Sequence, residues 1–219
     1  MIAHAFSIIV NELNRHLKTY DLPDSLDTAS NRTVPGNLSE GFASGAADSG
    51  AVPRNKLVLS VVNITEEKTL KNLPSYVRSD DRLSVTYENP PIFLTVKILL
   101  TATHTNYLKA LLMLSRGLQF FQHRPTFTQN DVDPESLIPP PELDRHLLDQ
   151  LTSFKLVFDL YSPGMEEVNH LWGTLGGKQY PFALYIIRVL DLKFKVVQPA
   201  SGVITEVISD VRHKIPVVN

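Results

Sequence analysis

The chain has 219 residues, 43% of them hydrophobic and 20% charged, a balance typical of a globular protein and too apolar for a disordered one. Its 21 Lys and Arg residues against 23 Asp and Glu residues give a net charge of -2, so no basic field is available to hold nucleic acid, and we expect no nucleic-acid partner. The sequence contains no cysteine, which excludes disulfides, thiolate nucleophiles and cysteine zinc sites.

The N-terminal segment predicts an amphipathic helix rather than a signal peptide. Its apolar residues recur at steps of four and three and so share one helical stripe: Ile2, Phe6, Ile9, Leu13 and Leu17. No basic leader precedes them, and no apolar run reaches the roughly 18 to 20 residues of a membrane helix. We therefore expect synthesis in the cytoplasm and no membrane partner.

Residues 25–55 predict a long flexible loop. Ser, Gly, Ala, Asp and Asn dominate this segment, and such a composition does not build a continuous element. We expect one short strand within it, near Arg32 to Val34. A loop of this length in a compact domain is usually functional or disordered.

Two strands and a helix are predicted next. Leu57 to Thr65 is rich in β-branched residues and apolar on both faces, which indicates a strand covered from both sides, by its own chain or by a neighbouring subunit. Ile92 to Thr103 alternates more strictly, with Ile92, Leu94, Val96, Ile98 and Leu100 on one face. A helix follows over Asn106 to Gln122, and its predicted buried stripe is Tyr107, Leu111, Leu114, Leu118 and Phe121.

The third quarter of the chain predicts a connector, two helices and a strand. Residues 129–141 form a polar, proline-rich connector, and a short helix carrying Leu143, Leu147 and Leu151 follows it. Phe154, Leu156, Phe158 and Leu160 alternate in a third strand. A helix with Met165, Val168, Trp172 and Leu175 then ends at the glycine cluster Gly173, Gly176 and Gly177.

The last predicted strand is unusually long. Phe182 to Val197 would extend over about 50 Å at about 3.3 Å per residue, which exceeds what a domain of this size contains without a bulge or a projection. Gln198 to Gly202 predicts a turn, after which Val203 to Val211 returns as a hairpin partner. We interpret residues 198–219 as a C-terminal arm.

These elements predict a single domain over residues 1–219 with an α+β, or mixed α/β, fold. We expect a mostly antiparallel sheet of four to six strands with helices packed on one face, a long loop and a projecting C-terminal hairpin.

The sequence contains no constellation that predicts catalysis, so we expect no enzyme and no cofactor or metal. Its seven histidines show no ligand spacing. Gly173 to Lys178 differs from a phosphate-binding loop in spacing and follows a helix instead of opening one. Glu66 and Glu67 could suggest acid–base chemistry, but solvated carboxylates or an ion pair between subunits explain them better. The chain is therefore expected to be a structural subunit.

Four segments resemble the signatures of one known family. They are Ser60 to Glu67, Asn89 to Ala102, Tyr107 to Gln122 with Phe127 and Thr128, and Asn169 to Pro181. In order and spacing they are similar to the cap, or tube-terminator, proteins of extracellular contractile injection systems, which are phage-tail-like particles of the antifeeding-prophage and virulence-cassette type. Thr95 and Phe182 depart from the family's Asn and Ser.

The resemblance implies a hexameric ring, made in the bacterial cytoplasm, that joins such a particle. The ring would stop growth of the inner tube and tie the last sheath ring to it, so the implied partners are other copies, the inner tube protein and the sheath protein. We expect the 25–55 loop to become ordered at such a contact, and the long last strand to supply an edge or arm.

The interface residues predicted on this basis are Glu66, Glu67, Arg188, Lys193, Lys195, Val203, Ile204, Val207 and Ile208. Two alternatives stay open at this point. One is another tail-completion or baseplate protein of the same particle, and the other is a small-molecule-binding α+β domain.

Overall fold

The computed structural model describes residues 1–20, 31–42, 52–67, 76–79, 84–87, 92–141, 146, 149–151, 153–192 and 200–202. The chain divides into two compact units. Unit 1 comprises Met1–Lys71 and Pro91–Phe194, and unit 2 comprises Asn72–Pro90 and Lys195–Asn219. The single domain over residues 1–219 stays a prediction.

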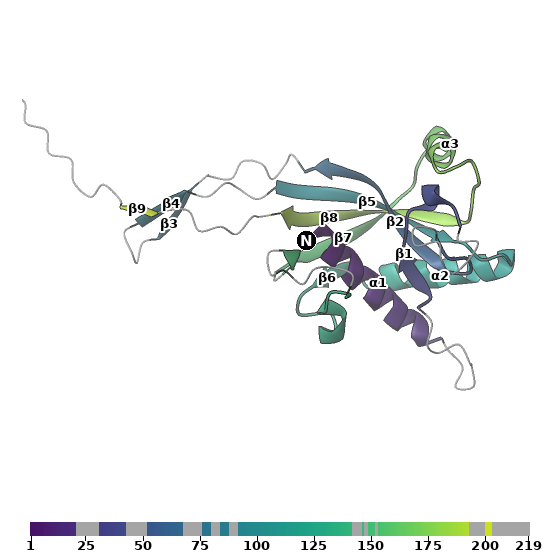
Figure 1. The fold of residues 1–219 in the computed structure, drawn as a ribbon, viewed down its shortest axis with the longest axis horizontal. Helices are drawn as coiled ribbons and strands as arrows, with labels where there is room; N and C mark the ends of the chain where they lie inside the picture. The colour runs from purple at the N-terminus through teal and green to yellow at the C-terminus, as the bar shows by residue number, and fades with distance from the viewer. Residues whose placement is uncertain are drawn as a thin grey trace, which may run out of the picture. The chain divides into compact units, whose positions relative to one another are not determined.

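A six-stranded sheet with the order β1-β2-β5-β8-β7-β6 forms the centre of unit 1 (Figure 1). Its strands are β1 (Thr33–Pro35), β2 (Leu57–Glu66), β5 (Ile92–Ala102), β6 (Thr126–Thr128), β7 (Lys155–Tyr161) and β8 (Phe182–Leu192). Only β1 and β2 run parallel, and the other neighbouring strands pair antiparallel. The α+β fold with a mostly antiparallel sheet is thus confirmed.

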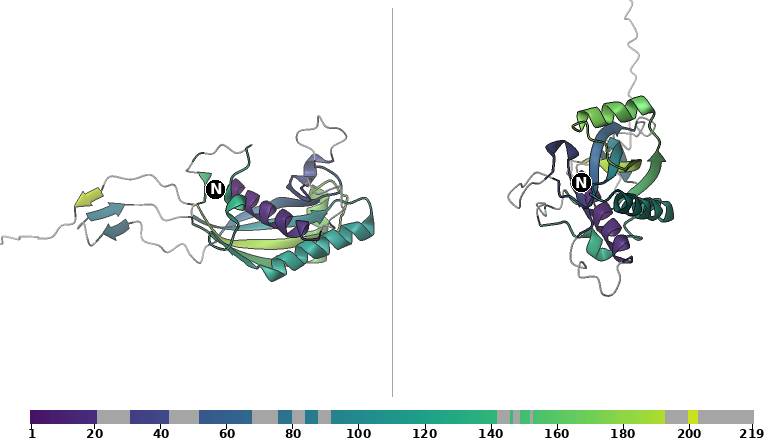
Figure 2. Two further views of the ribbon diagram at one scale, coloured as in Figure 1. Left: turned by 90° about the horizontal axis from the view of Figure 1, so that it is seen from below. Right: turned by 90° about the vertical axis from the view of Figure 1, so that its right-hand side faces the viewer.

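Helices cover both faces of this sheet. Helices α1 (Ile2–Lys18) and α2 (Tyr107–His123) lie on one face and α3 (Met165–Thr174) lies on the other (Figures 1 and 2). The prediction of helices on one face only was wrong, because the central strands are apolar on both faces. Leu99 and Leu184 pack with Trp172 of α3 in a second core cluster, separate from the main one under α1 and α2.

Helix α1 buries the predicted stripe, and α2 buries only part of its own, namely Leu114 and Phe121. Ile9, Leu13 and Leu17 are buried, as predicted, whereas Tyr107 and Leu111 are exposed. The buried face of α2 consists of Ala110, Met113, Leu114, Gly117, Phe120 and Phe121. A Cβ atom on Gly117 would lie 2.9 Å from Leu100 Cδ2, so the glycine lets the helix backbone approach the sheet and decides which side of α2 turns inward.

The strand faces follow the predicted alternation in β5 and partly in β7. Leu94, Val96, Ile98 and Leu100 are buried together, and only Ile92 at the strand start is exposed. In β7, however, Leu160 is 60% exposed and corrects the predicted stripe. The reason is the edge: β6 pairs only with residues 155–157, so the end of β7 lies without a strand on its outer side in the described chain.

Strand β8 confirms the long extended segment over Phe182–Leu192, and residues 193–197 lie outside the described chain. Its pairing with β5 shifts register between Leu94 and Val96, opposite Leu190 and Ile187, which places one extra residue on β8. This β-bulge is one of the two predicted ways to accommodate so long a strand.

The short strand within the 25–55 loop and the end of α3 agree with the predictions for these segments. In the 25–55 loop, β1 confirms the short strand, and a 3-10 turn at Leu38–Glu40 and a bridge between Phe42 and Val52 are also present. Gly176 and Gly177, with φ of 95° and 76°, end α3 as predicted. The helix expected around Leu143 and Leu147 lies outside the described residues.

Unit 2 contains a small antiparallel sheet with the order β3-β4-β9. Its strands are β3 (Tyr76–Ser79), β4 (Ser84–Tyr87) and β9 (Ala200–Gly202). The sequence pattern did not reveal β3 or β4. Ala200–Gly202, predicted as the turn of a C-terminal hairpin, instead forms a strand that pairs with β4, which satisfies its backbone groups. The rest of that hairpin, Val203 to Val211, lies outside the described residues.

Candidate interaction surfaces

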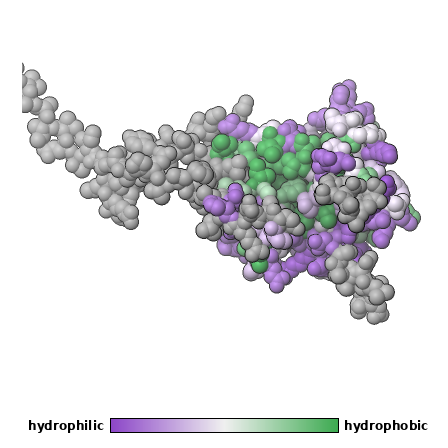
Figure 3. All heavy atoms as spheres, viewed as in Figure 1, coloured by the Kyte–Doolittle hydropathy of each residue, from purple (hydrophilic) through white to green (hydrophobic). Residues whose placement is uncertain are grey.

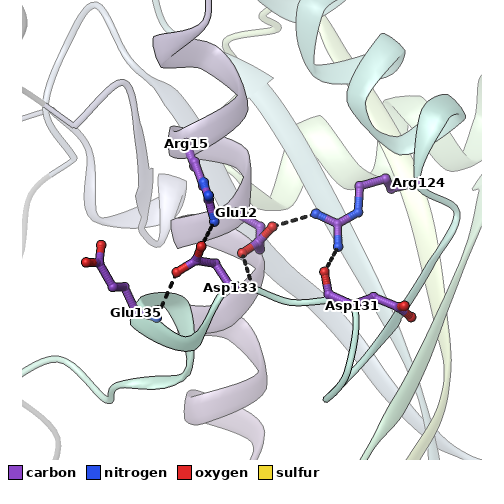
Figure 4. Close-up of polar contacts among 6 residues, drawn as sticks. All are labelled: Glu12, Arg15, Arg124, Asp131, Asp133 and Glu135. Atoms are coloured by element: carbon purple, nitrogen blue, oxygen red, sulfur yellow. Dashed lines mark hydrogen bonds and ion pairs between the residues drawn. The ribbon is translucent and has the colours of Figure 1, made fainter.

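Buried polar side chains on α1 anchor the loops of unit 1. Glu12, 3% exposed, accepts a hydrogen bond from Arg124 Nη1 at 2.6 Å and another from the Asp133 backbone N–H at 3.0 Å (Figure 4). Arg15 pairs with the Asp133 carboxylate, and Arg124 also donates to the Asp131 carbonyl. Both oxygens of this buried carboxylate therefore have partners within the chain, and the network holds the 129–141 connector against α1.

His4 and Asn14 complete this anchoring. His4 Nδ1 accepts from the Leu151 N–H at 2.9 Å, so Nε2, 2.8 Å from the Leu137 carbonyl oxygen, donates, and one neutral tautomer satisfies both contacts. Asn14 accepts from the N–H groups of Arg32 and Thr33 at 2.9 and 2.7 Å and donates to the Thr33 carbonyl at 2.8 Å. These groups position β1 and the connector, and we assign them no chemistry.

The first exposed apolar surface lies on the second half of β2. Val61, Val62 and Ile64 are 41%, 39% and 44% exposed, and Ile92 at the start of β5 is 54% exposed. We call these four residues the outer β2 patch. Strand β1 pairs only with Leu57–Leu59, so β2 beyond Ser60 has one edge without a strand partner among the described residues. Figure 3 shows a hydrophobic surface over this part of β2 and β5.

A β-bulge places Val61 and Ile64 of the outer β2 patch on one face. Val61 pairs with Ile98, and the register then shifts by one residue at Val62, so that Ile64 pairs with Val96. Directly paired residues of an antiparallel ladder point to the same face. Val61 and Ile64 therefore share the face of the main core, whereas regular alternation without the bulge would have turned Ile64 to the opposite face.

The second exposed apolar surface lies on the first half of α2. Tyr107, Leu108, Leu111 and Leu112 are 65%, 76%, 37% and 50% exposed, and we call them the outer α2 patch. Sequence reasoning assigned two of these residues to the core. The signal it passed over is that the first turns of α2 are apolar nearly all round, in the run Tyr-Leu-Lys-Ala-Leu-Leu-Met-Leu.

The surroundings of the outer α2 patch are basic. Helix α2 contains Lys109, Arg116 and His123 and no acidic residue, and Lys109 is exposed in its first turn. Burial, followed by the charges of Lys109 and Lys56, lowers the pKa of the nearby His104 to about 4. This end of unit 1 therefore holds positive charge next to exposed apolar side chains.

The predicted interface residues have different locations. Glu66 is exposed at the end of β2, and Glu67 accepts a hydrogen bond from Thr95 Oγ1 at 3.3 Å. Arg188 pairs with Asp159 at 2.7 Å on the surface of the same subunit. Lys193, Lys195, Val203, Ile204, Val207 and Ile208 lie outside the described residues. Of the predicted interface residues, the structure therefore describes only Glu66, Glu67 and Arg188, and the shared interface stays a prediction.

No reactive site is evident in the described part of the chain. It contains no cluster of three or more potential metal ligands, and no helix there is long and apolar enough to cross a membrane. A cavity of about 400 Å³ is lined by residues that include Phe93, Gln129, Ser153 and Lys155. These side chains offer hydrogen bonds but no nucleophile with an adjacent base.

Comparison with known proteins supports a single family. The profile described as the Pvc16 N-terminal domain matches residues 6–206, which is most of the chain. A search of curated proteins returns no sequence match.

Two solved structures are similar in fold. One is the sheath/tube terminator of an extracellular contractile injection system, PVC, in its extended state, with 12% identity, a TM-score of 0.53, and coverage of 96% of this chain and 64% of that chain. The other is the tube-terminating cap of the anti-feeding prophage, with 13% identity, a TM-score of 0.49, and coverage of 92% and 59%. This chain thus spans less than two thirds of either protein.

Proposed function

Because the chain belongs to the Pvc16 N-terminal domain family, as its motifs predicted, we propose that it is a cap of a contractile injection tube. In this role it forms a ring on the distal end of the tube, ends polymerisation of tube and sheath, and joins the last sheath ring to the tube. Its partners are other copies of itself, the inner tube protein and the sheath protein, and the role requires no catalysis.

The observation that carries the proposal is the family match over residues 6–206, together with a fold shared with a sheath/tube terminator over 96% of the chain. At 12% identity this likeness concerns the fold, so partners and stoichiometry are part of the proposal. A hexamer is the stoichiometry we propose, with assembly into an extracellular particle after synthesis in the bacterial cytoplasm.

The surfaces of unit 1 support a structural subunit. A protein that works alone rarely exposes two separate groups of large apolar side chains, whereas a ring subunit buries such groups against its neighbours. Over Leu184–Arg188 the last strand is not a sheet edge, because β8 lies there between β5 and β7. In the described chain β2 beyond Ser60 offers an edge to which another chain could add.

Deletion of the gene in a strain that makes the particle tests the cap role. We expect tubes of uncontrolled length by electron microscopy, because nothing would stop tube growth, and restored lengths when the gene is returned. A strain that makes few tubes would instead indicate a baseplate protein, and tubes of normal length would contradict the cap.

A small-molecule-binding domain is the remaining alternative. The 400 Å³ cavity in the described part of the chain is the observation that favours it. A panel of metabolites should leave the melting temperature of the purified protein unchanged, whereas a reproducible rise with one compound would favour this alternative over the cap.

A further inference from the structure

The face of the sheet that α1 and α2 cover continues beyond them into the outer β2 patch. Leu94, Val96 and Ile98 are buried in the main core, and the neighbouring positions of β2 on the same face are Glu66, Ile64 and Val61. Within unit 1 this apolar face is covered by helices. No described helix covers the end of this face at Val61 and Ile64, so its apolar side chains have the chemistry to receive another amphipathic helix.

The outer side of α2 is an apolar helix face without a partner in the described chain. Its inner side packs on the sheet through residues such as Met113, Leu114 and Phe121. Tyr107, Leu108, Leu111 and Leu112 project from the same helix and remain 37% to 76% exposed. Rigid packing of the inner side fixes the position of this outer face, so α2 can present it to another molecule without rearrangement.

The charges of the two patches are complementary. Glu66 follows Val61 and Ile64 on the same face of β2, since it pairs with Leu94. Lys109 lies between the exposed residues of the outer α2 patch, in the first turn of a helix with no acidic residue. The positive end of the helix dipole adds to that lysine, so the outer α2 patch favours a partner that carries a carboxylate beside apolar side chains.

The two patches lie at opposite ends of unit 1. Strand β2 begins beside the loop that leads into α2, where the Thr103 N–H donates to the Lys56 carbonyl at 3.0 Å, and the outer β2 patch lies at the far end of the same strand (Figure 1). Two different, complementary surfaces on one chain allow a head-to-tail contact that repeats from copy to copy, and such a contact closes into a ring when the rotation permits.

We propose that the outer α2 patch of one copy packs on the outer β2 patch of the next copy, with Lys109 facing Glu66. This contact rests on the proposed function, because it supplies the contact between neighbouring subunits of the ring.

Cysteine cross-linking in assembled particles tests this contact directly. The chain contains no native cysteine, so a variant carrying both Ile64→Cys and Leu108→Cys has only two thiols. After treatment with a short bifunctional thiol reagent, we expect a ladder of cross-linked multimers of this chain on denaturing gels. Single variants should stop at the level of unlinked chains, and a matched pair of Ile64→Cys with Met165→Cys, a residue 76% exposed on α3, should give no ladder.

Charge reversal provides a second measurement. Lys109→Glu should lower the fraction of particles with a cap and the fraction of protein in rings, and Glu66→Lys added to Lys109→Glu should recover both. Recovery by the double variant is not expected from misfolding, and circular dichroism of each variant confirms that unit 1 is folded.

The outcomes separate this contact from the cap role. Particles of normal tube length that give no ladder would overturn the contact between the two patches and leave the cap role in place. A cross-link from Ile64→Cys to the sheath protein, or from Leu108→Cys to the tube protein, would have the same meaning. Tube lengths that do not depend on the protein at all would overturn the cap itself.

Discussion

The two halves of β2 have similar residue types and opposite environments. Leu57–Ser60 is buried on both faces, whereas Val61–Glu66 is exposed throughout. The first half receives its cover from its own chain, namely β1 at the edge and helices on both faces. The second half has apolar residues without that cover. An apolar pattern thus indicates that the side chains of a strand are to be buried. Only the three-dimensional structure shows whether the same chain buries them.

Leu59→Ala should give the largest effect and tests the covered half. Leu59 is 0% exposed in the main core, so its truncation leaves a cavity that costs about 2–5 kcal/mol of the free energy of unfolding. Urea denaturation of the purified protein measures this loss. A loss of unfolding free energy no larger than that of a typical surface substitution would contradict the difference between the two halves of β2, because burial of the first half would then not stabilise the protein.

Asn14→Ala should give the next largest effect, since Asn14 holds the strand that covers β2 at its edge. The substitution leaves the Arg32 N–H, the Thr33 N–H and the Thr33 carbonyl without their partner, at a cost of about 1–3 kcal/mol. Hydrogen exchange should increase in β1 and at Leu57–Leu59 while β7 keeps its protection. Equal exchange in all strands would contradict a local role for Asn14.

His104 should make stability depend on pH at the end of unit 1 where β2 begins. Burial, together with Lys109 and Lys56, lowers the pKa of folded His104 to about 4 from an ordinary 6.5, so the unfolded chain binds the proton more readily. Its contribution is present above pH 6.5 and is lost as the pH falls to 4. Thermal melts of a His104→Phe variant should show a smaller decrease across this window than the natural protein, and equal decreases would contradict the assignment.

Ile64→Ser should give the smallest change in stability, and it tests most directly whether the exposed half of β2 differs from the buried half. Ile64 is 44% exposed, so the isolated protein should lose no more than about 0.5 kcal/mol. Assembly of rings and capped particles should nevertheless decrease, because the proposed contact between neighbouring copies buries this side chain. Leu59→Ser in the buried half is the matched control and should unfold the protein. A large loss of stability in Ile64→Ser would indicate cover from the same chain.

Local periodicity predicted most of the elements of unit 1. The stripe of α1, the alternation of β5 and the glycines that end α3 depend on neighbouring residues, and all are confirmed. The orientation of α2 was mispredicted because it depends on a distant contact, the approach of Gly117 to Leu100. The side of the sheet on which α3 packs also depends on residues far apart in the sequence.

The candidate surfaces were predicted less well than the fold. The family followed from the joint spacing of four motifs, and the cap role stays a proposal that rests on it. Glu66 lies beside the outer β2 patch, and its place in an interface stays a prediction. The outer α2 patch was missed, because exposed and buried leucines are chemically identical in a sequence. Strands β3 and β4 were also missed, since each has only four residues and shows no long alternation.

Because of the bulge at Val62, the facing of the exposed residues of β2 does not follow from the alternation of its buried residues. In a regular strand side chains alternate between the two faces, so the direction of an exposed residue follows from how many residues separate it from a buried one. One additional residue resets this count halfway along β2. Insertion or deletion of one residue at this position would therefore change which side chains of the second half of β2 point to the main-core face. Related chains could then contact different neighbours while Leu57–Ser60 stays unchanged.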